Sequence, residues 1–487
     1  MPRKYFGVVP HPAVGIRLPD IVAPPVLKAF KLADMVGTLM LSYHRETAPS
    51  EVIKSGEHVL LGHTGTSISE YVGKASRYAD EYGALIQVEA DHVSLMSSPE
   101  RAIKRITGGG FEYGLSEEEI RESLNYIERE FREVREAGGV DFVTLDTCEL
   151  IDLSVDGKGK EDVMAAFEEA FDEGVRKALL RDYVGRTYRF FTRGGRVFEI
   201  RLGEEDVVRL ALKFLRSVEY VRRVADLIGK YLEGRPYGIE VALDEVPRPT
   251  KPEELLFYLR ELRRAGVDPD FIAPNVGFRK REDFDGDLTE LARRVEELDA
   301  VARSFGALLS FHSGSGAHPH SDKGLGTWAV LREATGGMLK YKVSGVMIQL
   351  LLEVMASFPP GSRVRRLYEE IYDHVIEEVR KYVEGRTGLY SRHLETMLRD
   401  YEAASLKDPS KKYDPRADVF RHYFFIFQAL RDGKGRRWLR EEVLKLYEED
   451  DDLRRAYERE ATELILRMGW RLGLARNYVR FFAGGRQ

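Results

Sequence analysis

The chain has 487 residues, with 75 lysines and arginines against 81 aspartates and glutamates, so its formal net charge is −6. Hydrophobic residues make up 43% of the chain, enough for a large core, which excludes global disorder. The acidic balance argues against general nucleic-acid binding, and no apolar run is long enough to cross a membrane. The single cysteine, Cys148, excludes an internal disulfide. Because no apolar stretch follows Met1, we expect a cytoplasmic protein.

Amide side chains are scarce in this sequence. Asparagine occurs only at three positions and glutamine only at four: Asn125, Asn275, Asn477, Gln87, Gln349, Gln428 and Gln487. Together with 32% charged residues, this scarcity predicts a protein from a hot environment, where amides deamidate and ion-pair networks gain value.

Short apolar segments alternate with longer helical patterns as far as Gly345. Segments that are apolar on both faces are typical of parallel strands covered by helices on both sides. We expect strands at Tyr5–Val9, Gly37–Leu41, Val59–Gly62, Ala84–Glu89, Val140–Leu145, Gly238–Leu243, Phe271–Pro274, Ala307–Phe311 and Leu339–Val343. About eight such units favour an α/β fold of the TIM-like (β/α)8 barrel type over an open sheet.

The clearest helix begins after Ser116, whose hydroxyl and the carboxylate of Glu119 form the pattern of a capping box. Gly138 and Gly139 are expected to end this helix. Further helices are expected at residues 161–180, 206–233, 252–265 and 288–305.

Two regions depart from the alternation. Aromatic and β-branched residues on both sides of Gly194-Gly195 predict a hairpin inserted at about residues 186–203. From residue 359 the sequence is almost wholly helical, with helices expected at 362–384, 391–405, 418–431 and 437–470. We therefore expect a catalytic barrel of residues 1–358 and a C-terminal helical subdomain of residues 359–487 packed on it. Alternatively, these helices form a subunit interface, so a homo-oligomer is possible.

Polar residues follow four of the expected strands, where the strands of a barrel meet at one rim. These residues are Asp91-His92, Asp146-Thr147, Asp244-Glu245 and His312 to Ser315. Imidazoles combined with carboxylates suit Mn²⁺, Co²⁺, Ni²⁺ or Zn²⁺. Residues of these types at strand ends also cap helices or form structural hydrogen bonds, so the pattern alone leaves both interpretations open.

The strand ending near Asp244 raises a question of direction. If the strand stays regular through Glu245, alternation places Glu240 and Asp244 on one side and Glu245 on the other. Only one of Asp244 and Glu245 then faces the barrel axis, whereas a bend at the strand end would let both face it.

The segment from His312 to Gly324 is more polar than a simple connection requires. Its small residues would let the loop approach a ligand, and its serine hydroxyls and Lys323 suit a sugar hydroxyl or carboxylate. The alternative is a solvated turn with incidental histidines.

Three segments occur in the order Asp244–Pro252, Ile272–Phe278 and Leu309–Ser315, supported by Ala90–His92 and Gly336–Gly345. Together they resemble the tagaturonate/fructuronate epimerase family, including its tagatose 4-epimerase-like relatives. The resemblance implies a metal-dependent TIM-like barrel that acts on a ketohexuronate or a ketohexose, a small sugar or sugar acid.

The resemblance also implies roles for individual residues. It implies that His92, Glu245 and His312 bind a divalent Zn, Mn, Co or Ni ion. It makes Asp91, Asp146 and Asp244 the acid–base candidates. The residues expected to contact the substrate are Asn275, Ser313, Ser315, Asp322, Lys323 and Lys342. This chain departs from the family pattern where Gly316–His320 lengthens the loop before Ser321.

The implied reaction inverts the carbon two bonds from the ketone, and the hydrogen on that carbon is not acidic. Retro-aldol cleavage or transient oxidation by a nicotinamide therefore remain as routes. No Gly-x-Gly-x-x-Gly motif follows a strand, which favours retro-aldol chemistry. The alternatives are a metal-dependent aldolase, an aldose–ketose isomerase on a sugar or sugar phosphate, and a sugar-binding relative without activity.

Overall fold

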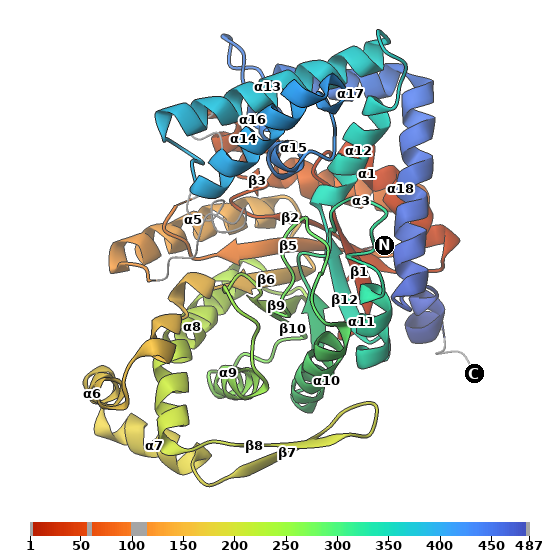
Figure 1. Ribbon diagram of the computed structural model, residues 1–487. Coiled ribbons are helices and arrows are strands. Elements are labelled where there is room, and N and C mark those ends of the chain that lie inside the picture. Colours follow the sequence, from red (N-terminus) through yellow and green to blue (C-terminus); the bar gives the residue numbers. More distant parts are fainter. Residues whose placement is uncertain (1–2, 56–60, 99–113, 484–487) are drawn as a thin grey trace.

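The structure, a computed structural model, describes residues 3–55, 61–98 and 114–483. Eight parallel strands close into a barrel, and each pairs with the strand that follows it along the chain until β12 pairs with β1 (Figure 1). The strands are β1 His11–Gly15, β2 Gly37–Ser42, β5 Ile86–Ser94, β6 Phe142–Asp146, β9 Gly238–Leu243, β10 Phe271–Pro274, β11 Leu308–Phe311 and β12 Leu339–Val343. The expected (β/α)8 barrel is therefore confirmed.

The prediction of the first strand at Tyr5–Val9 is wrong, because β1 begins at His11. Pro12 lowers the strand propensity of the true segment, since proline cannot donate to a ladder. Phe6 and Val9 instead pack against Val36 in a small cluster of their own. The apolar run Tyr5–Val9 therefore packs as an irregular segment, and the first barrel strand follows it at His11–Gly15.

The expected strand Val59–Gly62 falls partly outside the described residues. Its described part, Leu61–Gly62, is a turn. Nearby, β3 (Thr47–Ala48) and β4 (Thr66–Ser67) pair in a separate two-stranded sheet, and α2 (Ser50–Ser55) lies between them in the chain.

A longer helix follows each barrel strand and covers its outer face. These helices are α1 Pro19–Leu32, α3 Ile68–Tyr82, α5 Glu117–Glu136, α8 Glu204–Tyr231, α9 Pro252–Arg264, α10 Leu288–Ser304, α11 Thr327–Thr335 and α12 Gly345–Ala356. The capping box of α5 is confirmed: the N–H of Glu119 donates to Ser116 Oγ (3.2 Å), and the Ser116 N–H donates to the Glu119 carboxylate (2.7 Å).

An insertion separates β6 from α8 and ends in the expected hairpin. It contains η1 Cys148–Leu150, η2 Leu153–Gly157, α6 Lys160–Ala170, α7 Glu173–Tyr183, β7 Thr187–Phe191 and β8 Val197–Arg201. The single helix expected at 161–180 is two helices, because Asp172 caps α7 by accepting from the N–H of Val175 (2.9 Å). The antiparallel pair β7–β8 lies below the barrel in Figure 1.

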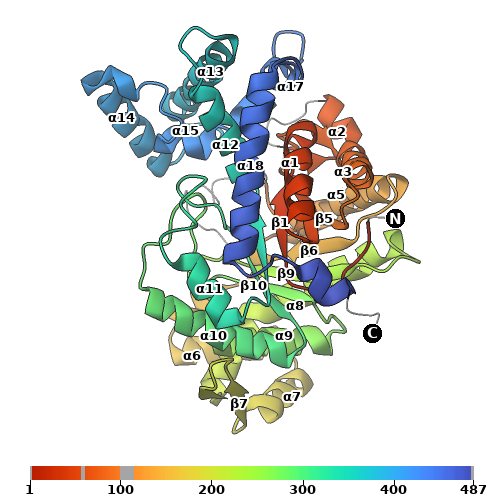
Figure 2. The same cartoon turned by 90° about the vertical axis from the view of Figure 1, so that its right-hand side faces the viewer.

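The chain after residue 359 is helical, as expected. Its helices are α13 Arg363–Gly385, α14 Arg392–Lys407, η3 Pro409–Lys411, α15 Asp418–Tyr423, α16 Ile426–Ala429, α17 Trp438–Glu449, α18 Asp451–Arg471 and η4 Val479–Ala483. Helices α13 to α17 gather at one end of the barrel, whereas α18 runs along its side against α1 (Figures 1 and 2). None of the helices in the described part of the chain is long and apolar enough to cross a membrane.

Charged residues fill the centre of the barrel. Lys340 pairs with Glu89 (2.8 Å) and Glu240 (3.0 Å), and Lys342 pairs with the same two carboxylates (2.7 and 2.9 Å). All four side chains are buried, so the charges must balance inside the barrel. The Lys340 ammonium also lies 4.0 Å from the ring centroid of Phe142. This network supports the side chains at the carboxyl ends of the strands.

Candidate active site

A pocket opens where the barrel strands end, beneath the C-terminal helices. Asp91, His92, Asp244, His312 and Lys342 line it together. These residues come from β5, from the turn after β9, from the turn after β11 and from β12. Five of the residues expected to carry the chemistry therefore share one cavity, where the fold positions side chains from separate strands.

His312 lies between two carboxylates. Its Nε2 is 2.5 Å from Glu240 Oε1 and its Nδ1 is 3.0 Å from Asp244 Oδ1. Burial alone would lower the pKa of His312, but Asp244 and Glu240 outweigh it and raise this pKa to about 9. Because Glu240 can only accept, Nε2 carries a proton and Nδ1 is the nitrogen that faces Asp244.

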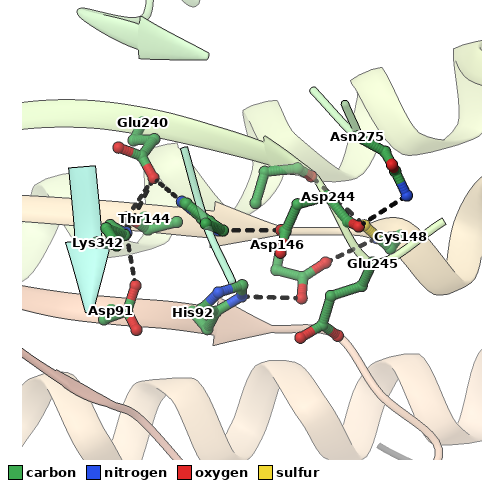
Figure 3. Close-up of polar contacts among 12 residues, drawn as sticks. Asp91, His92, Thr144, Asp146, Cys148, Glu240, Asp244, Glu245, Asn275 and Lys342 are labelled. Carbon is green, nitrogen blue, oxygen red and sulfur yellow. Dashed lines mark hydrogen bonds and ion pairs between the residues drawn. The ribbon is translucent and has the colours of Figure 1, made fainter. Parts of the chain in front are cut away.

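His92 is held in a strained backbone conformation, with a φ of 47°. Its Nδ1 lies 3.2 Å from Asp146 Oδ2, while Asp146 Oδ1 accepts from the N–H of Cys148 (2.9 Å), as Figure 3 shows. Asp146 therefore fixes the imidazole ring of His92 and leaves its Nε2 for another partner.

Two sets of three possible metal ligands occur among the described residues, and both include His92. The ligand atoms of His92, Asp244 and His312 lie within 4.8 Å of one another, as do those of His92, Asp146 and Glu245. Asp244 Oδ1 and His312 Nδ1 lie 3.0 Å apart, but Asp244 Oδ2 is buried and has no hydrogen-bond partner among the described residues. A buried carboxylate oxygen of this kind requires a compensating partner, so this donor set fits a divalent cation.

Glu245 forms ion pairs with two cationic side chains. Its Oε1 accepts from Arg45 Nη1 (3.1 Å) and Lys280 Nζ (2.7 Å). Strand β9 ends at Leu243, so regular alternation does not reach Asp244 and Glu245, and both turn toward the site (Figure 3). The structure thus shows the bend at the end of β9 that lets both Asp244 and Glu245 face the site.

Asp91 is bound on both oxygens. Lys342 Nζ donates to Oδ1 (2.6 Å) and Ser42 Oγ donates to Oδ2 (2.8 Å). Burial alone would raise the pKa of Asp91, but Lys342, His92 and His312 hold it well below the usual range. Asp91 is therefore an ionised carboxylate in the pocket wall.

The residues expected to contact substrate divide into two groups. Ser313, Ser315 and Lys342 line the pocket, and Ser313 has a φ of 54°. The amide of Asn275 donates instead to backbone carbonyls, at 2.6 Å for that of Val246. Contact between Asn275 and substrate remains a prediction.

Lys323 and Asp322 also bind protein groups outside the pocket lining. Lys323 Nζ donates to the carbonyls of Arg279 and Glu282, both at 2.6 Å, and thereby fixes the polar loop. Asp322 pairs with Arg467 of α18 at 3.0 Å. Substrate contact by these two residues also remains a prediction.

Several pocket residues escaped the sequence analysis. They are Arg17, Glu46, His63, Arg281, Ser344, His422 and Phe425. Arg17 and Ser344 follow β1 and β12, so the strand-end rule would have found Arg17 with the first strand in its correct place. His422 and Phe425 come from the C-terminal helices, and no motif marks them.

The fold and the pocket together define a (β/α)8-barrel protein with a metal-type site at the carboxyl ends of its strands. A sequence model of the family described as UxaE, tagaturonate epimerase, matches residues 126–465. The chain therefore belongs to the tagaturonate epimerase family.

Individual relatives agree with this assignment. A tagaturonate/fructuronate epimerase of Thermotoga maritima is 28% identical over 218 residues, which cover 44% of this chain and 42% of that protein. Crystal structures of a fructuronate-tagaturonate epimerase from Cohnella laeviribosi share the fold. The glycerol-bound form has a TM-score of 0.66 at 19% identity, covering 97% of this chain and 83% of that one. The native form has a TM-score of 0.65.

Proposed function

We propose that this protein interconverts tagaturonate and fructuronate, the substrates after which its relatives are named. The observation that carries the proposal is the convergence of His92, Asp244 and His312 in one pocket, where Asp244 Oδ2 is buried without a hydrogen-bond partner among the described residues. The proposed chemistry is retro-aldol cleavage followed by re-formation of the same bond.

This route follows from the position of the inverted carbon, which lies two bonds from the ketone. A base removes the proton of the hydroxyl on that carbon, and the bond to the carbon beside the ketone breaks. The fragments are an aldehyde and the enediolate of the ketone half. The aldehyde turns its other face, the bond re-forms, and the new alkoxide takes the proton back. Atoms and charge balance without an oxidant.

We propose that His92, Asp244 and His312 hold a divalent cation. When bound, this ion would act as a Lewis acid toward the ketone and its neighbouring hydroxyl. In this proposal Asp244 is a metal ligand and Glu245 is not, which reverses the ligand choice implied by the family resemblance. The reason is that Arg45 and Lys280 already balance the charge of Glu245. Asp146 orients His92 and Glu240 orients His312.

We propose that Asp91 moves the proton. Asp91 lines the pocket and, among the described residues, pairs with Lys342 and Ser42, whereas Asp146 pairs with His92 and Asp244 pairs with His312. Ser42 and Lys342 also hold the carboxylate in a fixed direction.

The expectations of a cytoplasmic location, a hot habitat and a homo-oligomer remain predictions.

The test is product analysis by NMR after incubation with fructuronate, before and after chelation and after return of Zn²⁺, Mn²⁺, Co²⁺ or Ni²⁺. We expect tagaturonate to form, chelation to stop the reaction and one of these ions to restore it. Three-carbon fragments would indicate an aldolase and an aldose would indicate an isomerase. Activity indifferent to chelation and to the added ions would remove the metal from the mechanism.

The ligand set is tested by metal content. His312→Ala and Asp244→Asn should reduce bound metal and lower activity by more than about 100-fold, the upper range for loss of a group that only orients a ligand. Glu245→Gln should retain the metal. If instead Glu245→Gln loses the metal and Asp244→Asn keeps it, the assignment suggested by the family resemblance is correct.

A further inference from the structure

Two arginines form a second charged cluster in the same pocket, at the start of α12. Arg17 and Arg281 line the pocket together with Ser344 and Gly345, the N-cap and first residue of that helix. This cluster takes no part in the metal-type site or in the proton transfer proposed above.

The guanidinium groups converge on Gly345. A Cβ atom built at Gly345 would lie 3.4 Å from Arg281 Nε, 3.5 Å from Arg281 Nη2 and 3.8 Å from Arg17 Nη1. The space beside the Gly345 backbone is thus bordered by both side chains. A small group placed there would meet two guanidinium groups and the first turn of a helix of 12 residues.

The first turn of α12 lacks a side-chain cap. Ser344 does not cap it, because its hydroxyl accepts from Arg17 Nε (3.1 Å) and donates to Glu46 Oε1 (3.2 Å). The free N–H groups and the dipole of an uncapped helix start favour an anion.

Arg17 is only 9% exposed, and among the described residues its Nη1 has no hydrogen-bond partner. Its other nitrogens are used: Nη2 pairs with Glu46 Oε1 at 2.6 Å. Nη1, which faces Gly345, is thus a buried donor that requires an acceptor.

Arg281 is held by backbone atoms of the C-terminal helices. Its Nη1 donates to the carbonyls of Arg421 (2.5 Å) and His422, and no carboxylate within the described ranges forms an ion pair with it. Burial, together with Arg17 and Arg421, lowers the pKa of Arg281 to about 9. Arg421 has a carboxylate of its own in Asp418 (2.8 Å). Arg17 and Arg281 set against Glu46 thus leave a surplus of one positive charge.

We propose that Arg17, Arg281 and the first amides of α12 bind the carboxylate of the sugar acid, a proposal that rests on the proposed function. One surplus charge matches a carboxylate monoanion better than a phosphate dianion. The subsite makes the pocket select a ketohexuronate over a neutral ketohexose, which carries a hydroxymethyl group at the same end.

The cleanest test is Gly345→Ala. It fills the space beside both guanidinium groups, removes no side-chain contact and places a better helix former in α12. The ratio of kcat/KM for tagaturonate to kcat/KM for tagatose should fall by about 10- to 150-fold, the effect of losing one charge-assisted hydrogen bond. The matched control is Gly73→Ala in α3, where an added Cβ meets nothing within 4 Å, and the ratio should not change.

Binding of sugars that do not react separates this proposal from the proposed reaction. Calorimetry with glucuronate, glucose and glucose 6-phosphate should show wild type preferring glucuronate, and Gly345→Ala should abolish that preference. If wild type epimerises nothing but shows this pattern, the subsite stands and the reaction falls. If epimerisation occurs and Gly345→Ala slows tagaturonate and tagatose equally, the reaction stands and the subsite falls. Tighter binding of glucose 6-phosphate than of glucuronate would also overturn the carboxylate assignment.

Discussion

His92 and His312 each use one ring nitrogen to bind a carboxylate that lies behind the pocket wall. Glu240 binds His312 from inside the barrel, at 2.5 Å, and Asp146 binds His92 from the end of β6, at 3.2 Å. A carboxylate behind an imidazole fixes the tautomer and makes the other nitrogen a better ligand. The buried lysines in turn fix Glu240, because Lys340 and Lys342 bind its two oxygens at 3.0 and 2.9 Å.

Replacement of Glu240 by Gln should weaken zinc binding by about 10- to 100-fold, because the uncharged amide supports His312 less well. Competition with a chromogenic chelator measures this affinity. The matched control is Glu89→Gln: Glu89 binds the same two lysines, but its third partner is Thr144 Oγ1, at 2.6 Å. Both variants should unfold at lower guanidinium concentration. An equal loss of zinc affinity in both variants would show that the charge balance of the barrel, rather than the bond to His312, supports the site.

The carboxylates and histidines of the site were accessible from the sequence because each comes directly after an apolar run. Asp91 and His92 lie in the last part of β5, and His312 follows β11. The arginines were not, because a chain with 75 lysines and arginines gives no reason to single out Arg17 or Arg281. The convergence of these two side chains depends on where β1 begins and on the carbonyls of a distant helix, and neither can be derived from a local pattern.

Between helices, an ion cluster joins α8 to α9 and to η2, with Lys213 and Glu254 buried and Asp156 exposed. Lys213 of α8 binds Glu254 of α9 (2.7 Å) and Asp156 of η2 (2.5 Å), and Arg248 binds the same two carboxylates. Burial alone would raise the pKa of Glu254, but Arg248 and Lys213 hold it below its ordinary value. The pKa of Asp156 is lowered by the same two cations against the effect of burial.

Lys213→Met should therefore lower the free energy of unfolding at pH 7 by about 2 to 3 kcal/mol, less than the full cost of breaking a buried pair because Arg248 remains. A lowered carboxyl pKa contributes stability above the unfolded value near pH 4, and this stability is lost as the pH falls through the folded value. The difference between variant and wild type should thus shrink below about pH 4. Guanidinium unfolding at several pH values measures it.

Arg222→Met is the control, on the solvent side of the same helix. Arg222 pairs with Asp226 at 3.0 Å, but both side chains are at least half exposed, so the change should cost less than about 1 kcal/mol. Similar losses in both variants, or a loss in Lys213→Met that persists unchanged in acid, would show that the cluster is not what stabilises this junction.

Most of the helices and strands of the barrel could be predicted from the sequence. The barrel strands from β2 onward were visible because both faces of each strand are buried, and α5 because its capping box is local. The short strands β3 and β4 were not predicted. Breaks inside helical patterns were missed at Asp172 and Asp450, each of which caps the following helix. An acidic residue within an amphipathic pattern carries no sign of whether it caps a helix or faces solvent.

In the whole molecule, the C-terminal helices complete the pocket rather than merely covering the barrel. His422 and Phe425 line the pocket, and the ring of Phe425 lies 5.0 Å from that of His63. Beyond α18, Asn477 binds the backbone of Val36 and Pro10, so the chain also returns to the opposite end of the barrel. Packing of these helices was expected from the sequence, but their contribution to the site was not.

Arg437 connects the C-terminal helices to the loop that carries His63. Its Nη1 donates to the carbonyl of His63 (2.9 Å) and to that of Gln428 (3.2 Å), and the side chain is 8% exposed. Arg437→Met should raise KM about 10-fold by releasing the loop, since a hydrogen bond from a charged group contributes roughly 1.5 to 3 kcal/mol. Metal content should stay at the wild-type level, because the ligands come from the barrel. The control is the neighbouring Arg436→Met, whose side chain is 60% exposed and pairs only with Asp432 among the described residues, and it should leave KM unchanged. A normal KM in Arg437→Met, or a loss of metal, would show that the helical layer does not act through this loop.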